Sequence, residues 1–222
     1  MATDWTDDYD MPSPPLNDKG RPRWPHAHQA KPVYLDIEFL GFEKDHHLIT
    51  EVAAWRVEDN APEVWRIKPN PEVMQRICDR DPRRWSQIKK AAEVNGYHPK
   101  LWADCPLWGD VKESIAQYLF GRVIVGVNTM AADIARLADG FWPRDTEWLM
   151  ACAGTKAPTA GAIELQTLAR MKGHPKTNLD ALCKHYGIPE ESTHTAEGGV
   201  RRVRAVAEAL LGMEVKHAFE AA

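Results

Sequence analysis

The stretch Val33-Tyr34-Leu35-Asp36-Ile37-Glu38-Phe39-Leu40 decides the fold. It is an apolar run typical of a strand, it ends at Gly41, and two acids interrupt it at alternate positions. Residues i and i+2 of a strand point to the same face, so the carboxylates of Asp36 and Glu38 lie together. In so apolar a run two acids repel each other and lose hydration unless a cation meets them. Mg²⁺ or Mn²⁺, which prefers oxygen ligands, is the natural counter-charge, and a strand face with both acids turned to water is the alternative.

The pattern around this strand predicts an α/β fold. Two further strands, at 48–57 and 63–67, follow across short polar turns and suit an antiparallel meander. The apolar run 122–127 is typical of a buried parallel strand. The other expected elements are short helices from 71 onward, a longer helix at 107–120, helices at 130–140, 162–171, 178–186 and from 196, and a short strand near 146–150. We therefore expect a mixed central sheet, three antiparallel strands and then parallel strands, flanked by helices.

Composition indicates a soluble globular protein with one sizeable core. The 222 residues are 44% hydrophobic and 27% charged, with a net charge of −4, which argues against a protein that coats nucleic acid by charge alone. No apolar run is long enough to span a membrane, and the four cysteines form no C-x-x-C pair, so we expect a cytoplasmic protein without a zinc or disulfide framework. Residues 1–30, with five prolines, are expected to be a flexible arm, 31–213 the domain and 214–222 a tail.

Two further residues are candidates for chemistry. Asp133 follows the run 122–127, at the end of a parallel strand where α/β sheets place ligands, although an acid near a helix start is favourable without any ligand. His194 lies in a polar loop before the last helix and could deprotonate an attacking water, because an imidazole titrates near neutral pH. Eight other histidines are present, so His194 carries little weight by itself.

Taken in order, these segments resemble the successive motifs of the DEDDh (DnaQ-like) 3′→5′ exonucleases of the ribonuclease H-like superfamily. The matching segments are 35–38, 125–133, 178–188 and 194–196, and the resemblance spans residues 33 to about 211. It implies a ribonuclease H-like fold that hydrolyses phosphodiester bonds at 3′ ends with two divalent ions. It also implies that Asp36 bridges the ions, that Glu38 and Asp133 each hold one, and that His194 is the general base.

The chain departs from this family at its last motif. The family pattern is His-x-Ala-x-x-Asp, and here the segment reads His194-Thr195-Ala196-Glu197-Gly198-Gly199. Gly199 therefore stands where the fourth metal-binding carboxylate is expected, which predicts that one of the two ions is weakly held. Glu197 is a substitute ligand only if it lies in a loop before the helix. The spacing from Asn128 to Asp133 is also one residue longer than the family pattern leads us to expect.

The sequence thus predicts an Mg²⁺- or Mn²⁺-dependent 3′→5′ exonuclease, with activity weakened by Gly199. Its expected partners are single-stranded DNA or RNA 3′ ends, with a homodimer or a replication protein as a further partner, and no membrane. The alternative is a catalytically inactive module of the same fold that binds nucleic acid or a protein. Three arginines of the last helix (Arg201, Arg202 and Arg204) either contact phosphates or form a solvated surface.

Overall fold

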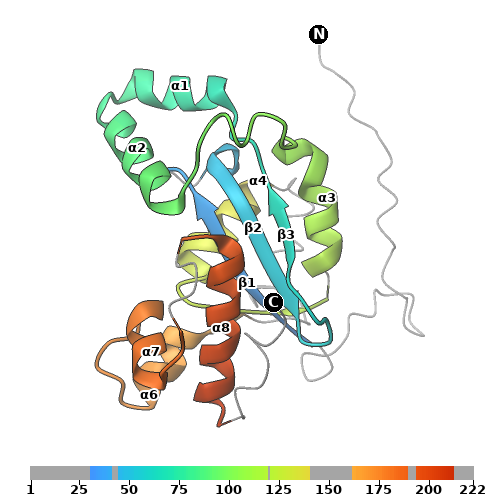
Figure 1. Ribbon diagram of the computed structural model, residues 1–222, viewed down its shortest axis with the longest axis vertical. Helices are drawn as coiled ribbons and strands as arrows, with labels where there is room; N and C mark the ends of the chain where they lie inside the picture. The colour runs from blue at the N-terminus through green and yellow to red at the C-terminus, as the bar shows by residue number, and fades with distance from the viewer. Residues whose placement is uncertain (1–30, 42–44, 120, 141–161, 190–193, 213–222) are drawn as a thin grey trace, which may run out of the picture.

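Five strands form one mixed sheet in the order β3-β2-β1-β4-β5 (Figure 1). The computed structural model describes residues 31–41, 45–119, 121–140, 162–189 and 194–212. Antiparallel pairing joins the first three strands, which are β1 (Pro32–Phe39), β2 (Ile49–Arg56) and β3 (Glu63–Arg66). Parallel pairing adds β4 (Val123–Gly126) to β1 and β5 (Ala162–Glu164) to β4. The predicted α/β class, with antiparallel strands followed by parallel ones, is confirmed.

The prediction of a single helix over 162–171 is wrong at its start. Residues 162–164 form β5, and the helix α6 (Leu165–Met171) begins only after it. A strand of three residues is too short for hydrophobic periodicity to reveal, and its pairing with β4 decides its conformation. The strand expected near 146–150 lies outside the described residues, as do the predicted arm 1–30 and tail 214–222.

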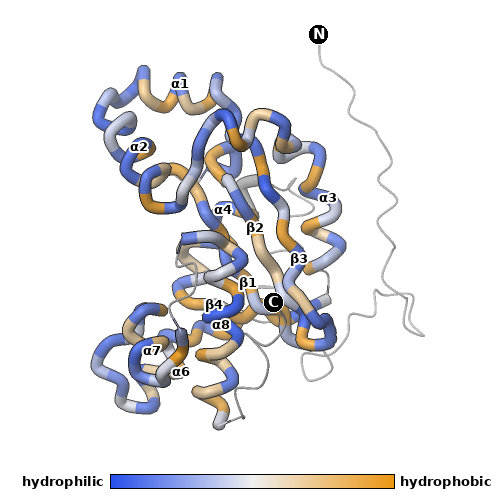
Figure 2. The backbone as a smooth tube through the Cα atoms, in the orientation of Figure 1, coloured by the Kyte–Doolittle hydropathy of each residue, from blue (hydrophilic) through white to orange (hydrophobic). Residues whose placement is uncertain are grey.

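Alternation along β1 divides the core between the two faces of the sheet. Val33, Leu35 and Ile37 point to the face covered by α3 (Trp108–Leu119) and by α4 (Ala135–Gly140) with the turn before it. Tyr34 points to the other face, where the long helix α8 (Ala196–Leu210) packs. Figure 2 shows hydrophobic residues along the central strands, whereas hydrophilic and hydrophobic residues alternate along the outer helices. A strand that is apolar on both sides is what the run 33–40 predicts.

Two helical pairs extend from opposite ends of the sheet (Figure 1). The first pair is α1 (Pro71–Arg80) and α2 (Arg83–Asn95), which share a small core with the end of β1 and with the 3₁₀ turn η2 (His46–Leu48). The second pair is α6 and α7 (Leu179–Tyr186), both packed on α8. Gly187 ends α7 because its φ of 67° is a left-handed conformation that glycine adopts without strain. Within the described residues no helix is long and apolar enough to cross a bilayer.

Candidate metal centre

Four acids approach one another under α8: three lie on the strands β1 and β2, and one lies in the turn after β4. Asp36 and Glu38 follow Tyr34 along β1 at a spacing of two residues, so all three side chains lie on the face of the sheet that α8 covers. Glu51 on β2 is the register partner of Glu38 and therefore lies on this face too. The sequence analysis missed Glu51, although it stands in a strand whose neighbours are almost all buried, and only 4% of its surface is exposed.

Asp133 reaches the same region from a π-helical turn, η3 (Met130–Ile134). The turn is marked by the bond from the Ile134 N–H to the Thr129 carbonyl, 2.8 Å, which spans five residues instead of four. A π-turn accommodates one residue more than an α-turn, and this accounts for the long spacing between Asn128 and Asp133. Asp133 is 5% exposed, at the carboxyl end of β4 beside β1. The extra residue therefore does not remove Asp133 from the site.

Burial and mutual repulsion raise the pKa of these carboxyl groups. The pKa of Asp36 is well above its ordinary value, first through burial and then through the charges of Asp133 and Glu38. Burial, followed by the charge of Glu51, raises the pKa of Glu38 to about 7. Burial is also the main cause of the raised pKa of Asp133, against which Thr129 and Arg136 act. Carboxylates perturbed by burial and by one another indicate a site that a cation would stabilise.

Asp36, Glu38 and Asp133 do not form a three-ligand site for one ion as they lie. Within the described residues, the triad whose ligand atoms all lie within 4.8 Å of one another is Asp45-His46-His47 in η2, and not Asp36, Glu38 and Asp133. A single ion therefore could not contact those three carboxylates as they lie. The charges of both Asp133 and Glu38 act strongly on Asp36, whereas Glu38 is only a minor influence on Asp133. Asp36 is thus the acid whose pKa both of the others raise.

Gly199 lies against the carboxylate of Asp36, in the first turn of α8. A Cβ atom at this position would overlap that carboxylate, at 2.5 Å from Asp36 Cγ and 3.1 Å from Oδ1. The φ of Gly199 is not positive, so the lack of a side chain serves close approach and not backbone conformation. Position 199 thus faces the acids, as the resemblance implies, but α8 sits so near β1 that only glycine fits without movement.

Glu197 and His194, the other two candidate residues of the last motif, are more exposed to solvent than Gly199. Glu197 pairs with Arg201 at 2.9 Å, and 45% of its side-chain surface is exposed. His194 is exposed, in the turn that leads into α8, where Thr195 caps the helix by accepting from the Gly198 N–H at 3.1 Å. Glu197 is therefore directed toward Arg201, and His194 lies exposed in the turn before α8.

Two further polar residues, which were not assigned to the site from sequence, lower the pKa of the acids. Arg202 is 5% exposed, pairs with Asp180 of α7 at 2.7 Å, and lowers the pKa of both Asp36 and Glu38. Asn95, at the end of α2, donates through Nδ2 to the Phe39 carbonyl at 3.2 Å and lowers the pKa of the Glu38 carboxyl. Neither could be found from sequence, because both are brought to β1 by helices far along the chain.

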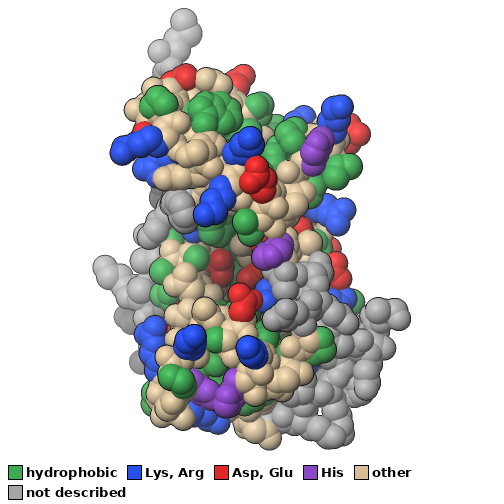
Figure 3. All heavy atoms as spheres, turned by 60° about the vertical axis from the view of Figure 1, so that its left-hand side comes forward, with side chains coloured by type: hydrophobic (Ala, Val, Ile, Leu, Met, Phe, Trp, Pro, Cys, Tyr) green, Lys and Arg blue, Asp and Glu red, His purple; other side chains and the backbone are tan. Residues whose placement is uncertain are grey.

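The surface above the acids is hollowed. Figure 3 shows a depression between the part formed by α1 and α2 and the part formed by α6 and α7, with acidic side chains in its floor and Lys and Arg side chains on both rims.

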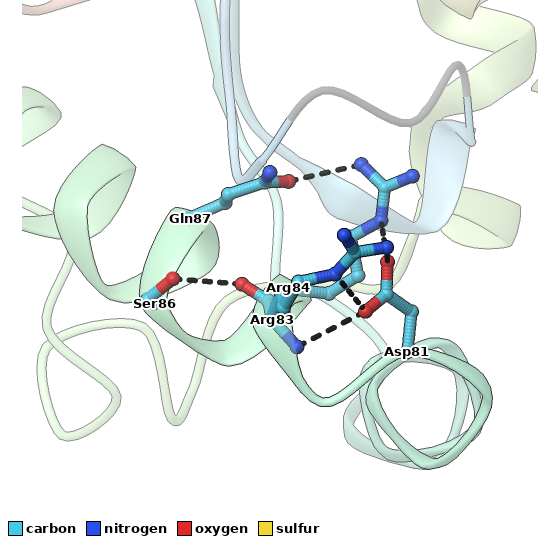
Figure 4. Close-up of polar contacts among 5 residues, drawn as sticks. All are labelled: Asp81, Arg83, Arg84, Ser86 and Gln87. Carbon is cyan, nitrogen blue, oxygen red and sulfur yellow. Dashed lines mark hydrogen bonds and ion pairs between the residues drawn. The ribbon is translucent and has the colours of Figure 1, made fainter.

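Several arginines are held in ion pairs. At the start of α2, Asp81 pairs with Arg83 at 2.9 Å and with Arg84 at 3.5 Å (Figure 4). Arg204 of α8 pairs with Glu208 at 3.0 Å, with its guanidinium 4.3 Å from the centre of the Trp55 ring. Arg204 is therefore a structural cation rather than part of a solvated surface.

Solved structures match most of the chain, whereas no family model and no curated protein does. A structure of exonuclease I is 17% identical with a TM-score of 0.66, over 86% of this chain and 42% of that chain. A zinc-bound form of an E. coli exonuclease I–ssDNA complex is 18% identical with a TM-score of 0.62, over 82% and 40%. Exonuclease I from Methylocaldum szegediense is 16% identical with a TM-score of 0.60, over 85% and 42%. The fold is that of the ribonuclease H-like part of exonuclease I, and the chain spans less than half the length of these proteins.

Proposed function

We propose that this chain is a metal-dependent 3′→5′ exonuclease of the DEDDh type, acting on single-stranded nucleic-acid ends with activity weakened at position 199. The observation that carries the proposal is the convergence of Asp36, Glu38 and Asp133, from β1 and η3, where the charges of Asp133 and Glu38 both raise the pKa of Asp36. These acids are desolvated and repel one another, so the structure favours a bound cation over the empty cluster.

The donor set fits Mg²⁺ or Mn²⁺. Every candidate ligand in the cluster is a carboxylate oxygen, and hard divalent ions take oxygen ligands, whereas zinc prefers nitrogen and sulfur. Asp36 would be shared by two ions, with Glu38 on one side and Asp133 on the other. Such ions supply charge stabilisation for the attacked phosphate and acidify the attacking water. His194, exposed in the turn that leads into α8, would accept the proton of that water.

Single-stranded substrate suits the hollow and its basic rims. The two parts of the molecule that border it carry separate sets of cations, which can contact the phosphates of one strand on both sides of the acids. Beside α7, a surface pocket is lined by Lys176, Lys184, His174 and His185. Asp180 in the same pocket is neutralised by Arg202, which leaves the lysine charges available to an anion. The exonuclease I complex with single-stranded DNA agrees with this choice of substrate.

The test is digestion of a single-stranded oligonucleotide that carries its label near the 5′ end, so that a ladder of shortened products reports 3′→5′ removal. We expect slow digestion in Mn²⁺ that stops in chelator and in Asp36→Asn. Glu208→Gln is a matched control. Glu208 is also a buried acid, 5% exposed, but it belongs to α8, pairs with Arg204 and lies outside the cluster. Digestion that persists in Asp36→Asn would come from a contaminating nuclease and would contradict the proposal.

A second candidate function is a nucleic-acid-binding module without catalysis. Two observations favour it: position 199 provides no carboxylate, and Arg202 already supplies a positive charge beside Asp36 and Glu38. This function predicts that the oligonucleotide binds equally well in chelator and in Mn²⁺ and is never shortened. Binding measured by fluorescence anisotropy under both conditions separates the two functions.

A further inference from the structure

We infer that Glu51 supplies the carboxylate that position 199 lacks, and that it is a fourth acidic residue of the metal centre. The inference rests on the proposed function and adds a residue to it. The sequence motifs do not include Glu51, and only the pairing of β1 with β2 brings it to the site.

Strand register fixes the position of Glu51. It lies directly opposite Glu38, and the next pair along the strands is Asp36 with Ala53 two residues away. Side chains of directly opposed residues in an antiparallel pair lie on one face, about 5 Å apart at Cβ. Glu51 is therefore adjacent to Glu38 and diagonal to Asp36, the two acids that the missing ligand would accompany.

Glu51 also reaches the helix turn from which the missing ligand would project. The backbone N–H of Glu197, in the same first turn of α8 as Gly199, lowers the pKa of the Glu51 carboxyl and therefore lies near it. The carboxylate thus lies between Glu38 and the start of α8, and its charge acts on both Asp36 and Glu38. Since position 199 provides no carboxylate, an acid from β2 can take that role.

Burial favours a role beyond capping the helix. A surface acid near a helix start needs no further explanation, because the helix dipole favours it. Glu51, however, is only 4% exposed and lies beside two partly buried acids, which a residue that served only as a cap would avoid. Glu197, the nearest other acid of the motif, pairs instead with Arg201 at 2.9 Å.

The experiment is calorimetric titration of the full chain with Mn²⁺ alone, without nucleic acid. Glu51→Gln keeps the shape of the side chain and an oxygen that can accept from Glu197, and removes only the charge. We expect the Mn²⁺ dissociation constant to rise by about 10–100-fold in Glu51→Gln, the size typical for a residue supporting a metal site. Glu51→Asp, which keeps the charge, should retain more of the affinity, and Glu208→Gln should bind as the wild type does.

The outcomes separate this inference from the function beneath it. Wild-type affinity for Mn²⁺ in Glu51→Gln, with only a change in melting temperature, would make Glu51 a structural cap and overturn the inference. Absence of Mn²⁺ binding to the wild-type chain would overturn the proposed function itself. His46→Ala/His47→Ala, measured alongside, identifies any heat that arises from the separate Asp45-His46-His47 triad.

Discussion

Restoring the family's missing acid through Gly199→Asp should destabilise the metal-free protein. A Cβ atom at 199 overlaps the Asp36 carboxylate, and forced movement in a packed interior costs about 1–3 kcal/mol. Replacing a helical glycine returns about 1 kcal/mol. The added charge, about 5 Å from that of Asp36 at an effective dielectric constant of about 20, costs roughly 3 kcal/mol. The free energy of unfolding should therefore fall by about 3–5 kcal/mol for Gly199→Asp and by about 0–2 kcal/mol for Gly199→Ala.

Thermal unfolding at about pH 8, in chelator and in saturating Mn²⁺, measures this effect. For a domain of this size, each kcal/mol corresponds to about 2–4 °C, so Gly199→Asp should melt about 10 °C below the wild type in chelator. Mn²⁺ should raise its melting temperature more than that of the wild type, because a further carboxylate then meets a cation. Adding Asp36→Asn should relieve most of the loss. Equal melting of Gly199→Asp and wild type in chelator, or strict additivity with Asp36→Asn, would refute this picture of a helix in contact with the acid.

Three further substitutions probe the charges around the acids. The pKa of Glu38 is raised to about 7, so its contribution to metal-free stability is full below about pH 4.5 and is lost as the pH rises through about 7. The loss is on the order of 3 kcal/mol. Glu38→Gln should flatten this part of the pH profile of urea unfolding. Arg202→Met should lower metal-free stability by about 3 kcal/mol, since it removes a buried cation from beside the acids, and should tighten Mn²⁺ binding in a calorimetric titration. Asn95→Ala should cost about 1–3 kcal/mol and move the pH midpoint of Mn²⁺ binding upward, because the donor that lowers the pKa of Glu38 is gone; unchanged binding midpoints would contradict its placement.

Patterns that depend on neighbouring residues were readable from sequence. The two-residue period of β1 places Asp36 and Glu38 on one face, and the apolar run before Asp133 marks a parallel strand whose end lies beside them. The C-terminal end of α7 follows from Gly187, and the start of α8 follows from the polar turn before Ala196. These features rest on local sterics and periodicity, which act along the chain.

Features that depend on packing were not readable. The proximity of Glu51 to Glu38 requires the register of two strands, and the burial of Arg202 requires the docking of α8 between β1 and α7. The π-turn that carries Asp133 replaces one hydrogen bond by another five residues back, and the sequence signals it only as one extra residue between Asn128 and Asp133. Gly199 was recognised as a missing ligand, but its closeness to Asp36 is a property of the helix position.

The most direct test of the metal centre is a crystal of the chain soaked in Mn²⁺ and measured at the manganese absorption edge. We expect an anomalous difference peak beside the Asp36 carboxylate, on the side of Asp133 or of Glu38, with the acids drawn inward from their metal-free positions. Anomalous peaks confined to Asp45-His46-His47, or no peak under α8, would contradict it.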